Sequence, residues 1–146
     1  MIRVTRRYRF AASHRLHAPQ LDDAANRRLY GKCNNPYGHG HNYVLEVSAR
    51  GRVDPLSGAA VDVALLDALV RDEVLGPFDQ HDLNTGIEAF RHSVPTSENL
   101  GREVFRRLSR EWPRVFPGPW PQLAAVRIAE TPRNFFEISA HEHESE

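Results

Sequence analysis

The chain has 146 residues, 40% of them hydrophobic, and its 19 acidic and 19 basic side chains balance, which is typical of one globular domain, expected at 1–140 before a polar tail at 141–146. No apolar run approaches the ~18 residues of a membrane-spanning helix, and the neutral charge argues against a broad nucleic-acid-binding surface. The first ten residues contain no apolar signal segment, and the single cysteine, Cys33, has no partner for an internal disulfide.

Two long strands are predicted first along the chain, at residues 2–12 and 43–53, because apolar and polar side chains alternate in both. We expect them to be antiparallel neighbours. A helix follows at residues 64–75, where apolar residues recur at helical spacing, and Gly76 and Pro77 are expected to end it. The residues expected to face inward on this helix are Leu65, Leu66, Leu69, Val70 and Val74.

The second half predicts another helix and a hairpin. A capping pattern at Thr96 or Ser97 indicates the start of a helix that runs to about Trp112, and the apolar residues of this helix form one stripe. The expected inward residues are Leu100, Val104, Phe105 and Leu108. Residues 112–121 form a loop rich in proline and glycine, and residues 123–130 and 135–140 form strands across a turn at 131–134. The order ββααββ predicts an α+β fold, an antiparallel sheet with helices on one face.

Histidines mark the most informative segment. His39 and His41 flank Gly40 just ahead of the second strand, and residues i and i+2 of extended backbone point to the same side. His14, at the end of the first strand, lies where a neighbouring strand can bring a third imidazole alongside. Three neutral imidazoles with one open position are the ligand set of a catalytic zinc. The alternative is an ordinary loop or hydrogen-bonded core.

Four acidic or thiol-bearing segments accompany the histidines. Cys33 lies six residues before His39, among polar and turn-forming neighbours that favour a reactive thiol over a buried inert one. Asp79 and His81 occur together in FDQHDLN, a pairing suited to proton transfer, although solvated surface residues give the same pattern. Glu130 ends a strand and could hold the N–H and amino groups of a guanine-like ring. Glu98 is already explained by helix capping, which is the stronger interpretation of this residue.

In combination these segments closely resemble the 6-pyruvoyltetrahydropterin synthase family, which includes the 6-carboxytetrahydropterin synthases of queuosine biosynthesis. The matching segments are FAASHRL at 10–16, YGKCNNPYGHGHNY at 30–43, FDQHDLN at 78–84, PTSENL at 95–100, and Glu130 with Thr131. The resemblance implies a tunnelling fold, with a four-stranded antiparallel sheet and two helices. It also implies a barrel closed by three subunits, and two such rings stacked into a homohexamer with active sites at subunit interfaces.

The resemblance further implies residue roles. His14, His39 and His41 match the zinc ligands and Cys33 the general base, while Glu130, with Glu98 and Thr96, matches the residues that anchor the pterin ring. The implied substrate is 7,8-dihydroneopterin triphosphate, with arginines, Arg15 among them, on the triphosphate. The implied location is cytoplasmic, with no membrane or nucleic-acid partner.

One position departs from the family pattern. Family members commonly have histidine directly after the aspartate, whereas here Gln80 follows Asp79 and His81 comes one position late. We expect a local shift that lets His81 serve in the proton relay beside Asp79.

Several functions remain open at this stage. The family resemblance implies a lyase forming 6-pyruvoyltetrahydropterin, and the 6-carboxy product is the alternative. The departure at Gln80 also keeps a catalytically inactive pterin-binding protein open. From a different class, a hydrolase could use Cys33 as nucleophile, His81 or His39 as base and Asp79 to orient the base.

Overall fold

A computed structural model describes residues 1–140, so the tail expected at 141–146 lies outside the described residues. The strands are β1 (Ile2–His14), β2 (His39–Gly51), β3 (His81–Asp82), β4 (Gln122–Thr131) and β5 (Asn134–Ser139). The main helices are α1 (Asp23–Tyr30), α2 (Val63–Val70), α3 (Gly76–Phe78), α4 (Leu83–Gly86) and α5 (Ser97–Val115). Three shorter helical turns are η1 (Gly31–Asn34), η2 (Arg71–Leu75) and η3 (Glu88–Arg91).

The five strands form one mixed sheet in the order β3-β1-β2-β4-β5. β1 and β2 are antiparallel, as predicted, and pair from Ile2 opposite Gly51 to His14 opposite His39. β4 and β5 continue the antiparallel sheet. The expectation of a purely four-stranded antiparallel sheet was wrong, because β3 adds a short parallel strand with His81 opposite Ala12. Two residues are too few for a periodic pattern to reveal.

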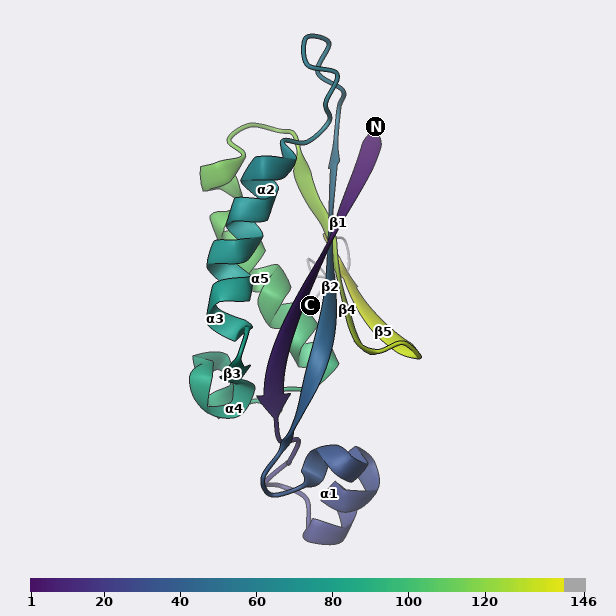
Figure 1. The fold of residues 1–146 in the computed structure, drawn as a ribbon, viewed down its shortest axis with the longest axis vertical. Coiled ribbons are helices and arrows are strands. Elements are labelled where there is room, and N and C mark those ends of the chain that lie inside the picture. Colours follow the sequence, from purple (N-terminus) through teal and green to yellow (C-terminus); the bar gives the residue numbers. More distant parts are fainter. Residues whose placement is uncertain (141–146) are drawn as a thin grey trace.

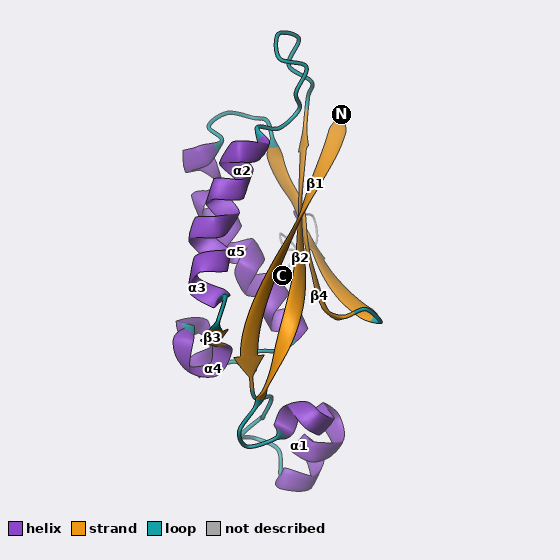
Figure 2. Cartoon of the chain, in the orientation of Figure 1, coloured by secondary structure: helices purple, strands orange, loops and turns teal. Residues whose placement is uncertain are grey.

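Helices α2, α3 and α5 cover one face of the sheet, and α1 lies beyond the end of β1 and β2 (Figures 1 and 2). The core lies between the covered face and these helices. The predicted apolar face of β2 is fully buried there, and the side chains concerned are Tyr43, Leu45, Val47 and Ala49. The predicted inward stripe of α5 is also buried. The α+β architecture with helices on one face is therefore confirmed.

The first covering helix differs from its prediction in two ways. It does not end at Gly76 and Pro77, because α2, the π-helical turn η2 and α3 follow one another without a break to Phe78. Pro77 is the second of the three residues of α3, directly after the π-helical turn, and the helical segment ends one residue later at Phe78. Leu65 is 45% exposed rather than inward, while Leu66 and Leu69 are buried.

The uncovered face of the sheet holds a row of alternating charges that crosses four strands, which we call the charge ladder. Arg7 Nη2 lies 3.6 Å from Glu46 Oε2, and Glu46 Oε1 lies 3.5 Å from Arg127 Nη1. Arg127 Nε lies 4.0 Å from Glu137 Oε2. The strand register places these residues directly opposite one another. The ladder therefore has a cation at the β1 end and a carboxylate at the β5 end.

Within residues 1–140, none of the helices combines the length and the apolar character that a bilayer crossing requires.

The carboxyl group of Glu103, on α5, makes the free energy of unfolding depend on pH. Burial alone would raise the pKa of Glu103, but hydrogen bonds from Arg106 (2.6 and 2.9 Å) and Arg107 (2.9 Å) outweigh burial and hold it below its ordinary value. The ion pairs therefore stabilise the fold fully above the unfolded pKa of ~4.3, and the contribution is lost as the pH falls through the lowered folded pKa.

Glu103→Gln should accordingly be less stable than the parent by about 1 kcal/mol at pH 7, since both arginines retain solvent contact. The difference should shrink below about pH 4.3 and vanish under the lowered pKa of Glu103. Urea unfolding of both proteins across this pH range measures it. A difference that stays constant into acid would contradict the assignment.

Candidate active site

Three histidines and Cys33 converge at the end of the β1–β2 pair that lies nearest to α1, where β1 finishes and β2 begins. The Nε2 atoms of His14 and His41 lie 3.0 Å apart. Cys33 Sγ lies 3.2 Å from Nε2 of His39 and 3.8 Å from Nε2 of His41. One donor atom from each of the four residues lies within 4.8 Å of all the others. The structure thus brings together the four residues that the sequence singled out in this segment.

Strand pairing explains the convergence of the imidazoles. His14 lies opposite His39, and Ala12 lies opposite His41, so the three rings lie on the same side of the sheet. Cys33 comes from η1, whose position is set by a hydrogen bond from the Leu16 N–H to the Cys33 carbonyl at 2.7 Å. A neighbouring pair of strands and one short turn therefore build the cluster.

Gly38 permits the close approach of the loop to β1. Its φ is +70°, and a Cβ there would lie 2.7 Å from the carbonyl oxygen of His14. Gly58 offers a matched comparison, because its φ is +74° with nothing within 4 Å of the same atom. We expect Gly58→Ala to cost about 1 kcal/mol from backbone strain alone. Gly38→Ala should cost at least twice that, since the His14 backbone must move as well.

Urea unfolding of the Gly38→Ala and Gly58→Ala variants, together with their metal affinity, measures this difference. Metal affinity should fall only in the Gly38→Ala protein. Equal stability losses in the two variants would show that the approach to His14 imposes no constraint.

The protonation of the histidines suits metal binding. His14 is fully buried, and its Nδ1–H donates to the Pro95 carbonyl at 2.9 Å, which leaves the Nε2 lone pair facing the cluster. Burial lowers the pKa of His14. The pKa of His41 is lowered to about 4, by burial first and then by His14 and His39. Both rings are neutral at physiological pH, which is the form that binds a metal ion.

Glu130 completes the cluster as its carboxylate. Its Oε1 lies 3.4 Å from His14 Nε2 and 3.2 Å from His41 Nε2. Two imidazole lone pairs and a carboxylate oxygen directed at one another repel unless a cation or a proton lies between them. A bound divalent cation would satisfy the two imidazole nitrogens, and its charge would also attract the neighbouring carboxylate, so the histidine set fits a metal ion. Burial, then Glu98, raises the pKa of Glu130.

Cys33 is half-buried beside these groups. Burial, followed by the negative charge of Glu130, raises the pKa of its thiol. The charge of a bound cation acts in the opposite direction on a nearby thiol.

Helix capping explains part of the predicted pterin-anchoring set. The Thr96 hydroxyl accepts a hydrogen bond from the Asn99 N–H at 3.2 Å and so caps α5. Glu98 lies in the first turn of the same helix. Glu130 lies at an irregularity in the β4–β5 pairing, between Ala129 and Thr131. Such a bulge re-aims a side chain, here toward the histidines.

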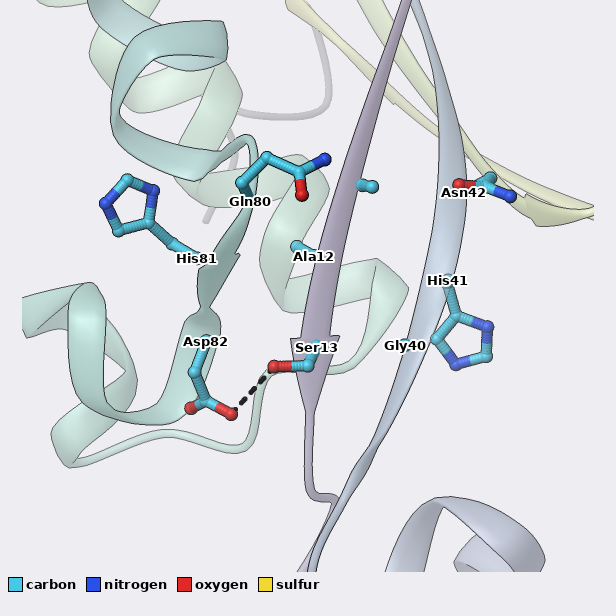
Figure 3. A pocket seen from close by; sticks show the side chains of 9 residues that line it. Ala12, Ser13, Gly40, His41, Asn42, Gln80, His81 and Asp82 are labelled. Carbon is cyan, nitrogen blue, oxygen red and sulfur yellow. Dashed lines mark hydrogen bonds between the residues drawn. The ribbon is translucent and has the colours of Figure 1, made fainter.

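Within the described residues, the hydrogen bonds of the predicted relay residues Asp79 and His81 do not involve Cys33. Figure 3 shows the His81 ring directed away from β1, while the His41 ring lies on the far side of β2. The Asp79 carboxylate accepts a hydrogen bond from the Ala11 N–H at 2.9 Å, and His81 Nδ1 lies 2.8 Å from the Asp79 carbonyl. Gln80 has a φ of +61° and donates its backbone N–H to the Ala11 carbonyl.

Gln80 and His81 line a pocket of about 340 Å³ that β3 shares with β1 and β2, and His41 of the cluster lines the same pocket (Figure 3). Asp82 lines it too and accepts a hydrogen bond from the Ser13 hydroxyl at 2.9 Å. Of the hydrolase hypothesis, the structure keeps the pairing of Cys33 with His39, whose Nε2 lies 3.2 Å from Sγ, but it places the Asp79 carboxylate on the Ala11 N–H rather than on that ring.

Sequence reasoning missed two contacts of His14. The Pro95 carbonyl fixes its tautomer, and the Tyr43 hydroxyl lies 3.2 Å from its Nδ1. The alternating pattern of β2 marked Tyr43 only as a core residue, and no side-chain pattern signals a carbonyl. Both groups act on the ring nitrogen that faces away from the cluster.

The fold and the site define a class: small α+β enzymes whose antiparallel strands end in a metal-binding set of histidines with a thiol and a carboxylate beside it. Residues 3–141 match the sequence profile of the family described as 6-pyruvoyl tetrahydropterin synthase. The chain belongs to this family.

Individual relatives agree with this assignment. The 6-pyruvoyl tetrahydrobiopterin synthase of Poecilia reticulata is 37% identical over 131 residues, which cover 90% of this chain and 85% of that protein. The structure of Caenorhabditis elegans 6-pyruvoyl tetrahydropterin synthase superposes with a TM-score of 0.83 and 41% identity, covering 95% of each chain. The 6-carboxy-5,6,7,8-tetrahydropterin synthase of Rickettsia bellii is 28% identical over 153 residues, 94% of this chain and 100% of that protein.

Proposed function

We propose that this protein is a zinc-dependent lyase that converts 7,8-dihydroneopterin triphosphate to 6-pyruvoyltetrahydropterin with elimination of triphosphate. The observation that carries the proposal is the convergence of His14, His39 and His41 with the Cys33 thiol in a member of this family. The greater identity to the relative named for the pyruvoyl product than to the one named for the carboxy product supports that reaction.

In this proposal His14, His39 and His41 hold the zinc ion. Neutral imidazoles with an open fourth position are the ligand set of catalytic zinc. When bound, zinc supplies a Lewis acid that polarises the side-chain hydroxyls of the substrate. The Pro95 carbonyl keeps His14 in the tautomer that presents Nε2 to the metal.

Cys33 takes the proton from the carbon beside the pterin ring. The thiol lies 3.2 Å from His39 Nε2, so it borders the position where the polarised carbon would sit. We assign it as the general base rather than a fourth ligand, because a fourth protein ligand would close the site to substrate.

Glu130 holds the pterin ring through its N–H and amino groups, with Glu98 and Thr96 beside it. Partial burial supports this role, since a carboxylate shielded from water forms stronger hydrogen bonds to a ligand. Asp79 and His81 supply the proton relay. The direction of the His81 ring, away from β1, leads us to assign this pair to the site of a neighbouring subunit.

The assembly that we propose is a homohexamer of two stacked trimeric barrels, each subunit a single domain at 1–140. β5 pairs with no other strand on its outer side within those residues, and β3 covers only the end of β1. The charge ladder has Arg7 at one of these edges and Glu137 at the other, so the edges of two copies are complementary. A free Cys33 thiol suits the reducing cytoplasm.

The test is to incubate the zinc-loaded protein with 7,8-dihydroneopterin triphosphate and to identify the products by mass spectrometry. Formation of 6-pyruvoyltetrahydropterin and triphosphate supports the proposal. A 6-carboxy product, with acetaldehyde released, would assign the protein to the queuosine-pathway reaction, the alternative kept open by the Rickettsia bellii relative. Unchanged substrate bound to the zinc protein would make it a pterin-binding protein without turnover.

A further inference from the structure

A small pocket lined by arginines lies on the sheet at the end of the β1–β2 pair that is farthest from α1. Its volume is about 140 Å³. Its polar lining consists of Arg3, Arg50, Gln122 and Ser139, and among the described residues no acidic side chain lines it. We call it the arginine pocket. β1 begins and β2 ends at this end of the sheet, whereas the histidine cluster lies at the other end (Figure 1).

The strand register places two like charges side by side in this pocket. Arg3 lies directly opposite Arg50, and Arg50 lies opposite Gln122. Farther along the same two strands the charge ladder alternates in sign, because Arg7 there lies opposite Glu46. Like charges directly opposite each other destabilise a sheet. The repulsion between Arg3 and Arg50 is therefore a cost that a bound anion would remove.

The two arginines of the pocket have no acidic partner in the part of the chain that the structure describes. The ion pairs within residues 1–140 all involve other side chains. Many other arginines are neutralised, as Arg106 and Arg107 are by Glu103. A chain with no net charge thus leaves two neighbouring cations uncompensated at one place, which favours an anionic ligand.

The remaining polar groups of the pocket can also donate hydrogen bonds. Arg50 Nε and Nη2 donate to Gln122 Oε1 at 3.3 and 3.0 Å. Because the oxygen of this amide accepts from Arg50, its NH₂ group is the part that can donate to a ligand. The hydroxyl of Ser139 can donate as well. Two guanidinium groups, an amide and a hydroxyl form a donor set that suits an oxyanion.

The Arg50 guanidinium is held in place before any ligand binds. Besides its hydrogen bonds to Gln122, it lies 5.7 Å from the centre of the Trp120 ring. The segment that carries Trp120 is itself fixed, since the indole N–H of Trp112 donates to the Pro121 carbonyl at 3.0 Å. A side chain that is already ordered loses less entropy when it contacts a ligand.

The size and position of the arginine pocket narrow the choice of ligand. A volume of about 140 Å³ corresponds to roughly five water molecules at about 30 Å³ each, which suits one phosphate group with its four oxygens. Arg3 and His14 lie on the same strand, and eleven residues at about 3.3 Å each separate them by roughly 36 Å. A pterin triphosphate molecule is far too short to reach both, so the pocket is separate from the candidate active site.

We propose that the arginine pocket binds a single phosphate group, carried by free phosphate or by a small phosphate ester. Arg3 and Arg50 contact its oxygens from β1 and β2, and the Gln122 amide contacts it from β4. Guanidinium groups suit this task because they donate paired hydrogen bonds to phosphate oxygens. The bound group also links three strands at the end of the sheet, so it stabilises the folded protein. This inference does not depend on the proposed function.

The test of binding compares Arg50→Gln with Arg52→Gln. Both arginines lie over the Trp120 ring and both variants lose one positive charge, but only Arg50 lines the pocket. Calorimetric titration of the zinc-loaded proteins with inorganic phosphate measures the affinity. We expect Arg50→Gln to bind about tenfold more weakly than the parent, and Arg52→Gln to stay within about twofold. Phosphate held elsewhere on the protein would bind both variants as it binds the parent, and that result would overturn the inference.

Thermal unfolding of Arg3→Gln provides a second and independent test. Without phosphate this variant should be at least as stable as the parent, because the repulsion between Arg3 and Arg50 is gone. Phosphate should raise the Tm of the parent by more than that of Arg3→Gln. Equal increases in both proteins would contradict the proposal.

A titration with glycerol 3-phosphate distinguishes the two sources of the phosphate group. Binding as tight as that of inorganic phosphate, with the same loss in Arg50→Gln, assigns the pocket to phosphate esters. Binding that is more than tenfold weaker than that of inorganic phosphate assigns it to the free ion. Either result supports a phosphate site, whereas glycerol 3-phosphate and inorganic phosphate that both bind independently of Arg50 would exclude it.

Discussion

Cys33→Ala is expected to lower kcat by about 10²–10⁴-fold while the protein keeps its fold and its metal. The thiol supplies the base in the proposed reaction, and alanine offers no group that accepts a proton. The three imidazoles do not depend on Cys33 for their position, because the pairing of β1 with β2 and the Pro95 carbonyl place them. Product formation under saturating substrate, with zinc content measured on the same sample, tests both halves of this expectation.

Two outcomes would change the assignment of Cys33. A fully active Cys33→Ala protein would show that another group removes the proton. Loss of stoichiometric zinc would show that the thiol is a metal ligand, a possibility raised by its distances of 3.2 and 3.8 Å from two ligand nitrogens. Cys33→Ser provides the matched comparison, since the hydroxyl keeps the shape of the side chain but is a far weaker base.

His41→Ala is expected to weaken zinc binding by about 100-fold or more and to abolish measurable turnover. Two imidazoles and a carboxylate remain, but the Nε2 that lies 3.0 Å from His14 Nε2 is removed. The stabilisation that zinc gives the folded protein should fall with the affinity, because a ligand stabilises the state that binds it by RT ln(1 + [L]/Kd). Competition with a chromophoric chelator measures the affinity, and the zinc-dependent shift of Tm measures the stabilisation.

His92→Ala is the control for His41→Ala, since His92 is an exposed histidine after η3 and does not belong to the cluster. It should bind zinc as tightly as the parent does. If both variants lose zinc equally, the cluster is not the metal site. If His41→Ala binds zinc as tightly as the parent and His92→Ala do, the ion has ligands other than the three histidines.

The long strands and the histidine cluster could be predicted because their signals are periodic and local. Alternation revealed the buried face of β2, and one glycine between His39 and His41 was enough to place two rings on one side. His14 could be added because the pairing of two neighbouring strands brings the ends of both together. These predictions depend on chain geometry that any sequence of this pattern shares.

The remaining features depend on contacts between distant residues. α1 could not be predicted, because the eight residues of this polar helix show no apolar stripe, and the buried amide of Asn26 ties the helix to the preceding residues 18–22. The continuation of the helix past Gly76 and Pro77, through the π-helical turn η2, has no periodic signal in the sequence either. The shift expected to bring His81 into the relay stays a prediction, because the His81 ring points away from β1 within one chain.

The position of the cluster on the β1–β2 ladder links metal binding to local opening of the sheet. His14 opposite His39 is the last pair of the ladder, and Ile2 opposite Gly51 is the first (Figure 1). Strand ends are where a sheet frays, so the opening that frees these amide protons to exchange also separates the zinc ligands. Zinc should therefore slow hydrogen exchange at residues 12–14 and 39–41, and should leave the opposite end of the same two strands unchanged.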